Sequence, residues 1–193
     1  MSSGKNGTTD LDKEFGIVKN AISSKSDEPD MIWEKDRKPI SLCSLDAQSA
    51  LSMKQFLEAC SNRPFREISR GITLLWAMAP SGDLWVAVEE IAELNGVSIV
   101  GGYPIRRHFP VAVDAERKLG HPCLLDGLEA RAAGELYLDQ VGDKFGWHLN
   151  FESGRFHREP ERRLNDDQIK NVAKQFANRI DVPIHLDING DFA

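Results

Sequence analysis

The chain of 193 residues is 41% hydrophobic and 28% charged, and it has a formal net charge of −6. This composition is typical of a soluble globular domain, and the length allows a core without disulfide or metal support. The longest apolar run, residues 72–80, is too short to span a bilayer, so we expect no membrane partner. The negative net charge excludes broad non-specific binding to nucleic acid, but it is compatible with a small cationic pocket.

The N-terminus lacks the basic start and apolar core of a secretory signal peptide. We therefore expect a cytoplasmic protein, or one that is delivered into a target cell without such a signal. Three widely spaced cysteines, with no C-x-x-C pair, predict reduced thiols. No H-E-x-x-H, Walker or G-x-G-x-x-G motif occurs, so we expect neither a metal site nor a bound cofactor.

The first forty residues differ from the rest in composition. Residues 1–40 are poor in core-forming side chains and rich in Ser, Lys, Asp and Gly, which predicts a flexible N-terminal segment. Helical spacing predicts one short helix within it, through Leu11, Phe15, Val18 and Ile22. Residues 41–193 are expected to form a single α+β domain that begins with a helix over 45–60, capped by Asp46 or Ser44.

Two apolar runs, 72–79 and 84–89, follow this helix and are separated by P-S-G-D. This arrangement predicts a β-hairpin, and the rival interpretation is a helix over 84–94. Residues 95–130 contain several Gly and Pro, which predicts loops with short strands at 98–101 and 111–113.

Hydrophobic and polar residues alternate along 131–138 and 144–151, which predicts two paired strands joined by a Gly-containing loop over 139–143. Because side chains alternate between the faces of a strand, one face is expected to be apolar. Its members are Leu136, Leu138, Phe145, Trp147, Leu149 and Phe151. The opposite face carries Arg131, Glu135, Tyr137, Lys144, His148 and Asn150, which is more polar chemistry than solubility requires.

The clearest helix signal begins at Asn165, which forms a possible capping box with Gln168. Its apolar stripe consists of Ile169, Val172, Ala173, Phe176, Ala177 and Ile180. A last strand opens at Pro183, with Val182, Ile184, Leu186 and Ile188 facing inward. Together these elements predict an α+β fold, a mostly antiparallel sheet of about five or six strands with helices packed on one face.

Histidines supply the first candidate chemistry. A neutral and a protonated imidazole can act as general base and general acid, roles that we assign to His121 and His148. Arg155 would stabilise charge on a phosphoryl oxygen, an assembly suited to metal-independent cleavage of RNA. The alternative is that these histidines are background, and that His148 lies on a solvated strand face.

A carboxylate and a turn supply the second candidate chemistry. Glu135 follows Gly134 and could act as a general base or ribose-hydroxyl acceptor, or could form a cross-strand pair with Lys144 or His148. The turn after the second strand can direct backbone N–H groups and a hydroxyl at an anion, or it is a plain turn. The candidate substrate-binding residues are Lys144, Asn150, Ser153, Gly154 and His157.

Four short motifs in this half of the chain, G-D-L-W-V-A, H-P-C-L, A-A-G-E and N-F-E-S-G-R-F, occupy 82–87, 121–124, 132–135 and 150–156. Their order resembles a module at the C-terminal ends of bacterial polymorphic toxins and effectors, in which an A-A-G-E strand precedes an N-x-S-G-H-Y turn. The resemblance implies a pocket lined by His121, Glu135, Asn150, Ser153 and Gly154. The chain departs from the pattern at Arg155 and Phe156, and His157 follows just beyond.

Two functions follow from these features. The first is a small toxin-like or effector-like enzyme that acts on a nucleotide or RNA, such as a metal-independent ribonuclease. The second is a non-catalytic protein-binding module, namely an immunity protein, adaptor or regulator, whose partner would be a cognate toxin or inhibitor. The polar strand face and the Ser-Gly-Arg turn motivate the first function. The acidic charge, the N-terminal segment and the lack of a strong catalytic motif motivate the second.

Overall fold

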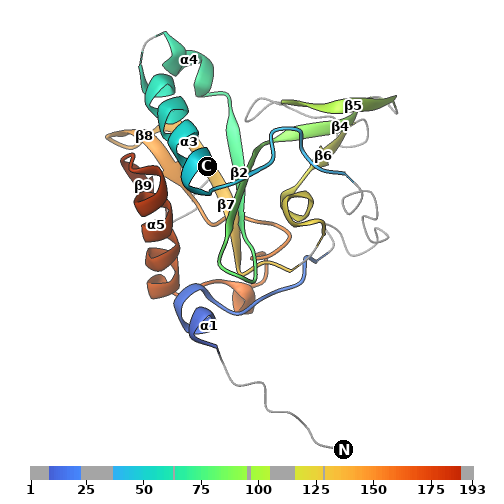
Figure 1. The fold of residues 1–193 in the computed structure, drawn as a ribbon, viewed down its shortest axis with the longest axis vertical. Helices are drawn as coiled ribbons and strands as arrows, with labels where there is room; N and C mark the ends of the chain where they lie inside the picture. Colours follow the sequence, from blue (N-terminus) through green and yellow to red (C-terminus); the bar gives the residue numbers. More distant parts are fainter. Residues whose placement is uncertain are drawn as a thin grey trace, which may run out of the picture.

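The computed structural model describes residues 9–22, 37–62, 64–94, 97–104, 116–127 and 129–187, of which 92–94, 97–104 and 116–118 are described by their backbone alone. Its centre is a six-stranded sheet in the order β1-β3-β2-β7-β8-β9 (Figure 1). The strands are β1 (Cys43–Ser44), β2 (Thr73–Met78), β3 (Leu84–Val88), β7 (Ala132–Val141), β8 (Lys144–Leu149) and β9 (Ile184–Leu186). All neighbours are antiparallel except β8 and β9, which are parallel. The predicted α+β class and mostly antiparallel sheet are therefore confirmed.

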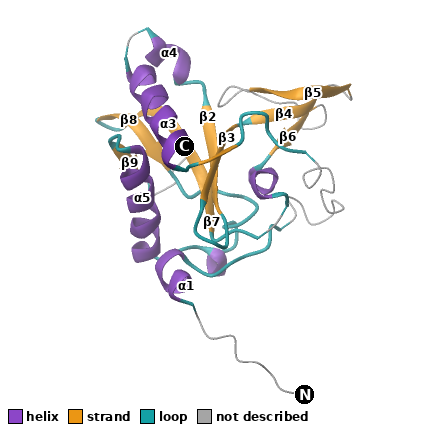
Figure 2. Ribbon diagram, viewed as in Figure 1, coloured by secondary structure: helices purple, strands orange, loops and turns teal. Residues whose placement is uncertain are grey.

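A smaller sheet of three antiparallel strands lies beside the central one (Figure 2). It contains β4 (Glu90–Leu94), β5 (Val97–Pro104) and β6 (Glu116–Leu119), in the order β5-β4-β6. The rival helix over 84–94 is wrong, because this stretch forms β3 and β4 instead. A predicted strand at 98–101 falls within β5, whereas 111–113 lies outside the described residues.

Helices cover one face of the central sheet. The α-helices are α1 (Asp10–Phe15), α3 (Ala47–Ser61), α4 (Phe65–Ser69) and α5 (Asp166–Ile180), and the described residues also contain two short 3-10 helices, η1 (His121–Leu125) and η2 (Pro160–Arg162). Side-chain caps begin three of them: Thr9 caps α1, Asp46 caps α3 and Asn165 caps α5. Each cap accepts a backbone N–H that has no partner inside the helix, which fixes where the helix begins.

The main core lies between the sheet and helices α3 and α5. The Trp76 ring makes edge contacts with Phe151 and Phe176, at centroid distances of 5.2 Å in each case. Trp147 in β8 donates from its indole N–H to the carbonyl of Leu57 in α3, at 3.0 Å. This pairing lets a large aromatic ring be buried with its polar atom satisfied.

The opposite face of the sheet carries a second apolar cluster, which covers part of that face. Leu75 and Ala133 from the strands pack there against Leu124 of η1 and against Phe156. Phe156 is fully buried, and it belongs to the turn that follows β8. The 3-10 helix and this turn therefore form a partial second layer, and most of the predicted site residues lie in it.

Strands β7 and β8 pair in the register that their alternation predicts. Leu136 lies opposite Leu149, and Leu138 lies opposite Trp147, on the face toward the main core. Tyr137 lies opposite His148 on the other face. The hydrophobic pattern can set this register because a slip of one residue would move every apolar side chain to the wrong face.

After β8 the chain crosses close over β7 at Gly134. A Cβ atom added to Gly134 would lie 2.2 Å from the carbonyl oxygen of Asn150 and 2.9 Å from the Cα of Phe151. Only glycine allows two backbones to approach this closely. The crossing brings the turn at 153–157 to the side of the sheet on which η1 lies.

The N-terminal residues 9–22 pack on the domain. Phe15 is part of the main core, and Lys19 pairs through both backbone groups with Ala130. The buried Arg131 guanidinium donates to Asp12 at 2.6 Å and to the carbonyl of Gly16 at 2.8 Å. The predicted helix is shorter than the apolar spacing implied, because α1 ends at Phe15. The boundary near residue 40 stays a prediction, since 23–36 lie outside the described residues.

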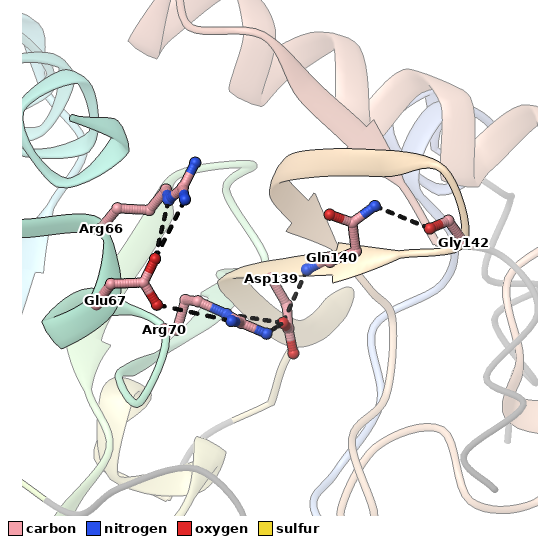
Figure 3. A network of polar contacts seen from close by, with 6 residues as sticks. All are labelled: Arg66, Glu67, Arg70, Asp139, Gln140 and Gly142. Atoms are coloured by element: carbon pink, nitrogen blue, oxygen red, sulfur yellow. Dashed lines mark hydrogen bonds and ion pairs between the residues drawn. The ribbon is translucent and has the colours of Figure 1, made fainter. Parts of the chain in front are cut away.

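Helix α4 is tied to the end of the β7–β8 hairpin by a charged network (Figure 3). Arg70 donates to Asp139 at 2.7 Å, and Glu67 accepts from Arg66 at 3.2 Å. The Arg66 guanidinium also lies 4.6 Å from the centre of the Phe145 ring. These groups are partly exposed, so the network positions the hairpin more than it stabilises the fold.

Candidate functional site

Most of the predicted site residues, together with neighbours that the sequence did not single out, lie in two groups on the face of the sheet away from α3 and α5. We name the first the turn cluster, which consists of Lys19, His121, Ser153, Arg155 and His157. We name the second the strand cluster, which consists of Tyr137, His148, His185 and Asp187. Glu135 and Asn150 lie along the strands between them.

His121 begins η1 and is buried against the sheet. Its Nε2 donates to the carbonyl oxygen of Gly134 at 2.9 Å. A carbonyl only accepts, so this contact places a proton on Nε2 and the lone pair of the neutral ring on Nδ1. Burial lowers the pKa of His121, and the nearby Arg155 charge lowers it further. His121 is therefore a neutral, oriented imidazole at pH 7.

The imidazole of His157 is the opposite tautomer to that of His121. Its backbone N–H donates to the carbonyl of Ser153 at 2.8 Å, which closes the turn, and its Nδ1 donates to the carbonyl of Phe151 at 3.1 Å. Its lone pair therefore lies on Nε2, a buried atom that has no hydrogen-bond partner among the described residues. Burial first, and the Lys19 charge second, lower the pKa of His157 to about 4. The ring is a neutral base at pH 7.

Ser153 also has a buried polar atom without a hydrogen-bond partner among the described residues. Its side chain is buried, and its Oγ has no hydrogen-bond partner within the described part of the chain. Most buried polar atoms in folded proteins are paired, so two unpaired ones a single turn apart need an explanation. A bound water or a ligand atom is the usual one.

Lys19 supplies buried positive charge to the same place. Its side chain is 7% exposed, and its ammonium donates to the carbonyl of Arg162 at 2.5 Å. It ion-pairs with no carboxylate among the described residues. Burial, and then the Arg162 charge, lower its pKa to about 8. Sequence reasoning missed Lys19, because nothing local distinguishes a lysine brought in from an N-terminal segment.

Arg155 joins the same two segments. Its guanidinium donates to the carbonyl of Ile22, and its own carbonyl accepts from the N–H of Ile22 at 2.8 Å. Arg155 is half-buried, and the neighbouring Gly154 is exposed. Arg155 thus holds the N-terminal segment in place while its charge acts on His121. Gly154 is where solvent reaches the turn.

Glu135 and Asn150 form a pair of their own. The Asn150 side-chain oxygen accepts from the backbone N–H of Glu135 at 2.8 Å and of Glu152 at 3.1 Å. Its amide nitrogen donates to the Glu135 carboxylate at 3.3 Å. Asn150 is therefore a positioning residue for Glu135, and the alternative pairs of Glu135 with Lys144 or His148 do not form.

Lys144 lies apart from both clusters. It is exposed at the hairpin turn, opposite Val141, six positions along β7 from Glu135. At about 3.3 Å per strand residue, this separation is roughly 20 Å. A ligand in the turn cluster would not reach it unless the ligand were extended.

His148 belongs to a different environment from His121. Its ring stacks on Tyr137 with a centroid distance of 5.5 Å and lies 5.1 Å from the ring of His185. Its main electrostatic neighbours are His185 and Asp187, whereas those of His121 are Glu89 and Arg155. The structure brings together His121, Ser153, Arg155 and His157, and it places His148 in the separate strand cluster.

No group of three or more His, Cys, Asp or Glu side chains within the described residues could hold a metal ion. None of the helices in the described ranges has the length and apolar character needed to cross a membrane. The turn cluster itself contains two neutral imidazoles, a hydroxyl and two cations.

Comparisons with known proteins add no relative to this description. No protein-family model matches the chain. Neither a curated protein nor a solved structure matches it.

Proposed function

We propose that the chain acts on a phosphate-bearing substrate, RNA or a nucleotide, at the turn cluster. The observation that carries the proposal is the pair of unpartnered buried atoms, Ser153 Oγ and His157 Nε2, beside the ammonium of Lys19. Leaving a buried polar group unpaired costs about 1–3 kcal/mol, so a site with two of them favours a ligand that supplies partners. A phosphoryl group offers oxygen acceptors to the hydroxyl and to both cations.

The electrostatics of the cluster suit cleavage of an RNA phosphodiester. His157 Nε2 would take the proton of a ribose 2′-hydroxyl, whose oxygen attacks phosphorus. The bond from phosphorus to the 5′-oxygen breaks, and that oxygen takes a proton from Lys19. Arg155 and the Ser153 hydroxyl would stabilise charge on the non-bridging oxygens. The step is balanced without a metal ion.

The two proton-transfer groups differ in pKa in the direction that this chemistry needs. His157, with a pKa of about 4, is free to accept a proton at pH 7. Lys19, with a pKa of about 8, is mostly protonated at pH 7, yet it releases a proton far more readily than an ordinary lysine. Groups whose environments push their pKa values apart in this way are typical of acid–base pairs.

A bell-shaped pH dependence follows. We expect kcat/KM for a short RNA to rise as His157 deprotonates above a pH of about 4 and to fall as Lys19 deprotonates above a pH of about 8. Cleavage rates would be measured across this range, with circular dichroism at each pH to confirm that the fold persists. In Lys19→Arg the alkaline limb should move upward, because the guanidinium does not deprotonate there. An alkaline limb that stays in place contradicts the role given to Lys19.

The biological setting remains part of the proposal. An enzyme that cleaves RNA would act as a toxin-like or effector-like domain, which agrees with the order of motifs noted in the sequence. Induced expression in a bacterial host should slow growth and degrade total RNA. Growth that continues with intact RNA, while the protein accumulates in folded form, would count against this setting.

A protein-binding module is the second candidate, and one observation favours it. A groove of about 520 Å³ lies between α3 and the β1–β3 edge of the sheet. Its lining includes Cys43, Met53, Phe56, Leu74, Val86 and Val88. Phe56 is 38% exposed there, and a partly exposed aromatic ring is a common anchor in protein interfaces.

This second candidate has a matched test. If a partner occupies the groove, Phe56→Asp should abolish its capture from lysate of the native host, because a charge would enter the apolar lining. Leu51→Asp is the control, since Leu51 is exposed on the same helix but does not line the groove. The readout is a stoichiometric band identified by mass spectrometry. Loss of capture in both variants, or in neither, would exclude the groove as the binding surface.

A further inference from the structure

The strand cluster contains two histidines in direct register at the edge of the sheet. His148 in β8 and His185 in β9 are paired residues of parallel strands. Their ring centroids are 5.1 Å apart, and Tyr137 stacks on the other side of His148 at 5.5 Å. The His148 ring is therefore enclosed between two aromatic rings.

The His148 Nε2 atom is buried and unpaired among the described residues. His148 is 2% exposed, and Nε2 has no hydrogen-bond partner in the described part of the chain. A proton at that atom would be buried without an acceptor, which costs far more than a proton on a solvated imidazole. It would also face the ring of His185, so the two rings cannot both become charged without repulsion.

Other groups that face His148 oppose this effect only in part. Among the described residues, Tyr137 and the carboxylate of Asp187 are the other titratable groups next to His148, and Asp187 already accepts the Tyr137 hydroxyl at 2.7 Å. Asp187 and backbone groups of Asp139 and Lys144 favour the protonated ring. Burial and the charge on His185 outweigh them, so the pKa of His148 lies below its ordinary value.

Among the described residues, few contacts hold β9 to the sheet. The strand has three residues and forms the last position of the sheet, with β8 as its neighbour. Ile184 and Leu186 are only partly buried against the core, and the N–H of Asp187 donates to the carbonyl of Leu149 at 2.9 Å. Short terminal elements of this kind open at a lower free energy than the core.

We propose that the His148–His185 pair makes the docking of β9 sensitive to protons, so that acidification releases the C-terminal strand from β8 while the rest of the fold persists. The direction of this pH effect follows from the protonation state of His148 that each form of the strand accepts. A neutral His148 fits the docked strand, whereas a protonated one fits only the open form. Docking is complete above the ordinary histidine pKa of about 6.5 and is lost as the pH falls through the lower folded value.

Amide hydrogen exchange measured by mass spectrometry tests the proposal. Between a pH of about 7.5 and about 5, exchange of the amides at 184–187, corrected for intrinsic rates, should accelerate at least about tenfold. The amides of α5 serve as the internal control and should keep their protection, because protonation of other buried histidines would destabilise both regions together.

Two variants make the test specific. His148→Phe keeps a flat ring against Tyr137 but cannot bind a proton, so the pH dependence of β9 exchange should disappear. His185→Gln removes the facing charge that lowers the pKa of His148, so the transition in β9 exchange should move to higher pH. Unchanged β9 protection at acidic pH, loss together with α5, or a wild-type response in both variants would overturn the proposal.

Discussion

Replacing His157 with asparagine should lower the rate of RNA cleavage by about 10²–10⁴-fold, the usual contribution of a general base. Asparagine can still donate to the carbonyl of Phe151, so the turn keeps its anchor, but the free lone pair of Nε2 is lost. The measurement is a single-turnover rate on a short RNA at pH 7, with the folded state checked by circular dichroism.

His148→Phe is the matched control for this loss. It also removes a buried histidine, but one that belongs to the strand cluster. It should retain cleavage within a few-fold of the wild type at pH 7. Equal losses in the two variants would indicate a general effect of core histidines on the fold. Retention of full activity in His157→Asn would exclude the proposed base, and an inactive wild type would exclude the ribonuclease itself.

Gly134→Ala should destabilise the protein by about 3 kcal/mol or more, in the range of severe core overpacking. The new methyl group would lie 2.2 Å from the carbonyl oxygen of Asn150, and neither backbone can move without breaking strand pairing. The variant should also displace Asn150 and His121, since both contact residues 134–135. Urea denaturation gives the free energy of unfolding.

Gly154→Ala provides the comparison for that measurement. Gly154 is exposed, and an added Cβ would lie 3.3 Å from the end of the flexible Arg158 side chain, which can move aside. Its free energy of unfolding should change by less than about 0.5 kcal/mol. If Gly134→Ala is as stable as Gly154→Ala, the close crossing of the two backbones is not a constraint on the fold.

Much of the central sheet was predictable because its signals are local or have period two. The alternation through Leu136 and Leu138, matched by Trp147 and Leu149, determines both the pairing and the inward face of the hairpin. The Asn165–Gln168 capping box marks the start of α5 directly. These features depend only on residues that are close in the sequence and on one buried face, so they can be recognised directly from the sequence.

The smaller sheet and η1 were not predictable in this way. Strand β4 has an irregular register between Ile91 and Glu93, which interrupts the alternation that would identify a strand. The H-P-C-L segment has no periodicity that distinguishes a 3-10 helix from a loop. Residues 17–22 carry no signal of the partner they pack against.

The grouping of the site residues was only partly predictable. The common face of Glu135 and His148 follows from alternation, but the distance between His121 and His148 depends on where η1 packs, which is a tertiary outcome. The close approach of the Asn150 backbone to Gly134 is likewise a tertiary contact. Lys19 enters the cluster through the pairing of its backbone with Ala130, a contact over more than a hundred residues of chain.

The pairing of Lys19 with Ala130 affects when the turn cluster can assemble during synthesis. Lys19 is synthesised more than 130 residues before Ser153 and His157, and Arg155 bonds the two segments together only when both are present. The cluster therefore cannot assemble while the later segment is still being made. For an enzyme directed at RNA, this order of synthesis would delay activity until both segments have emerged from the ribosome.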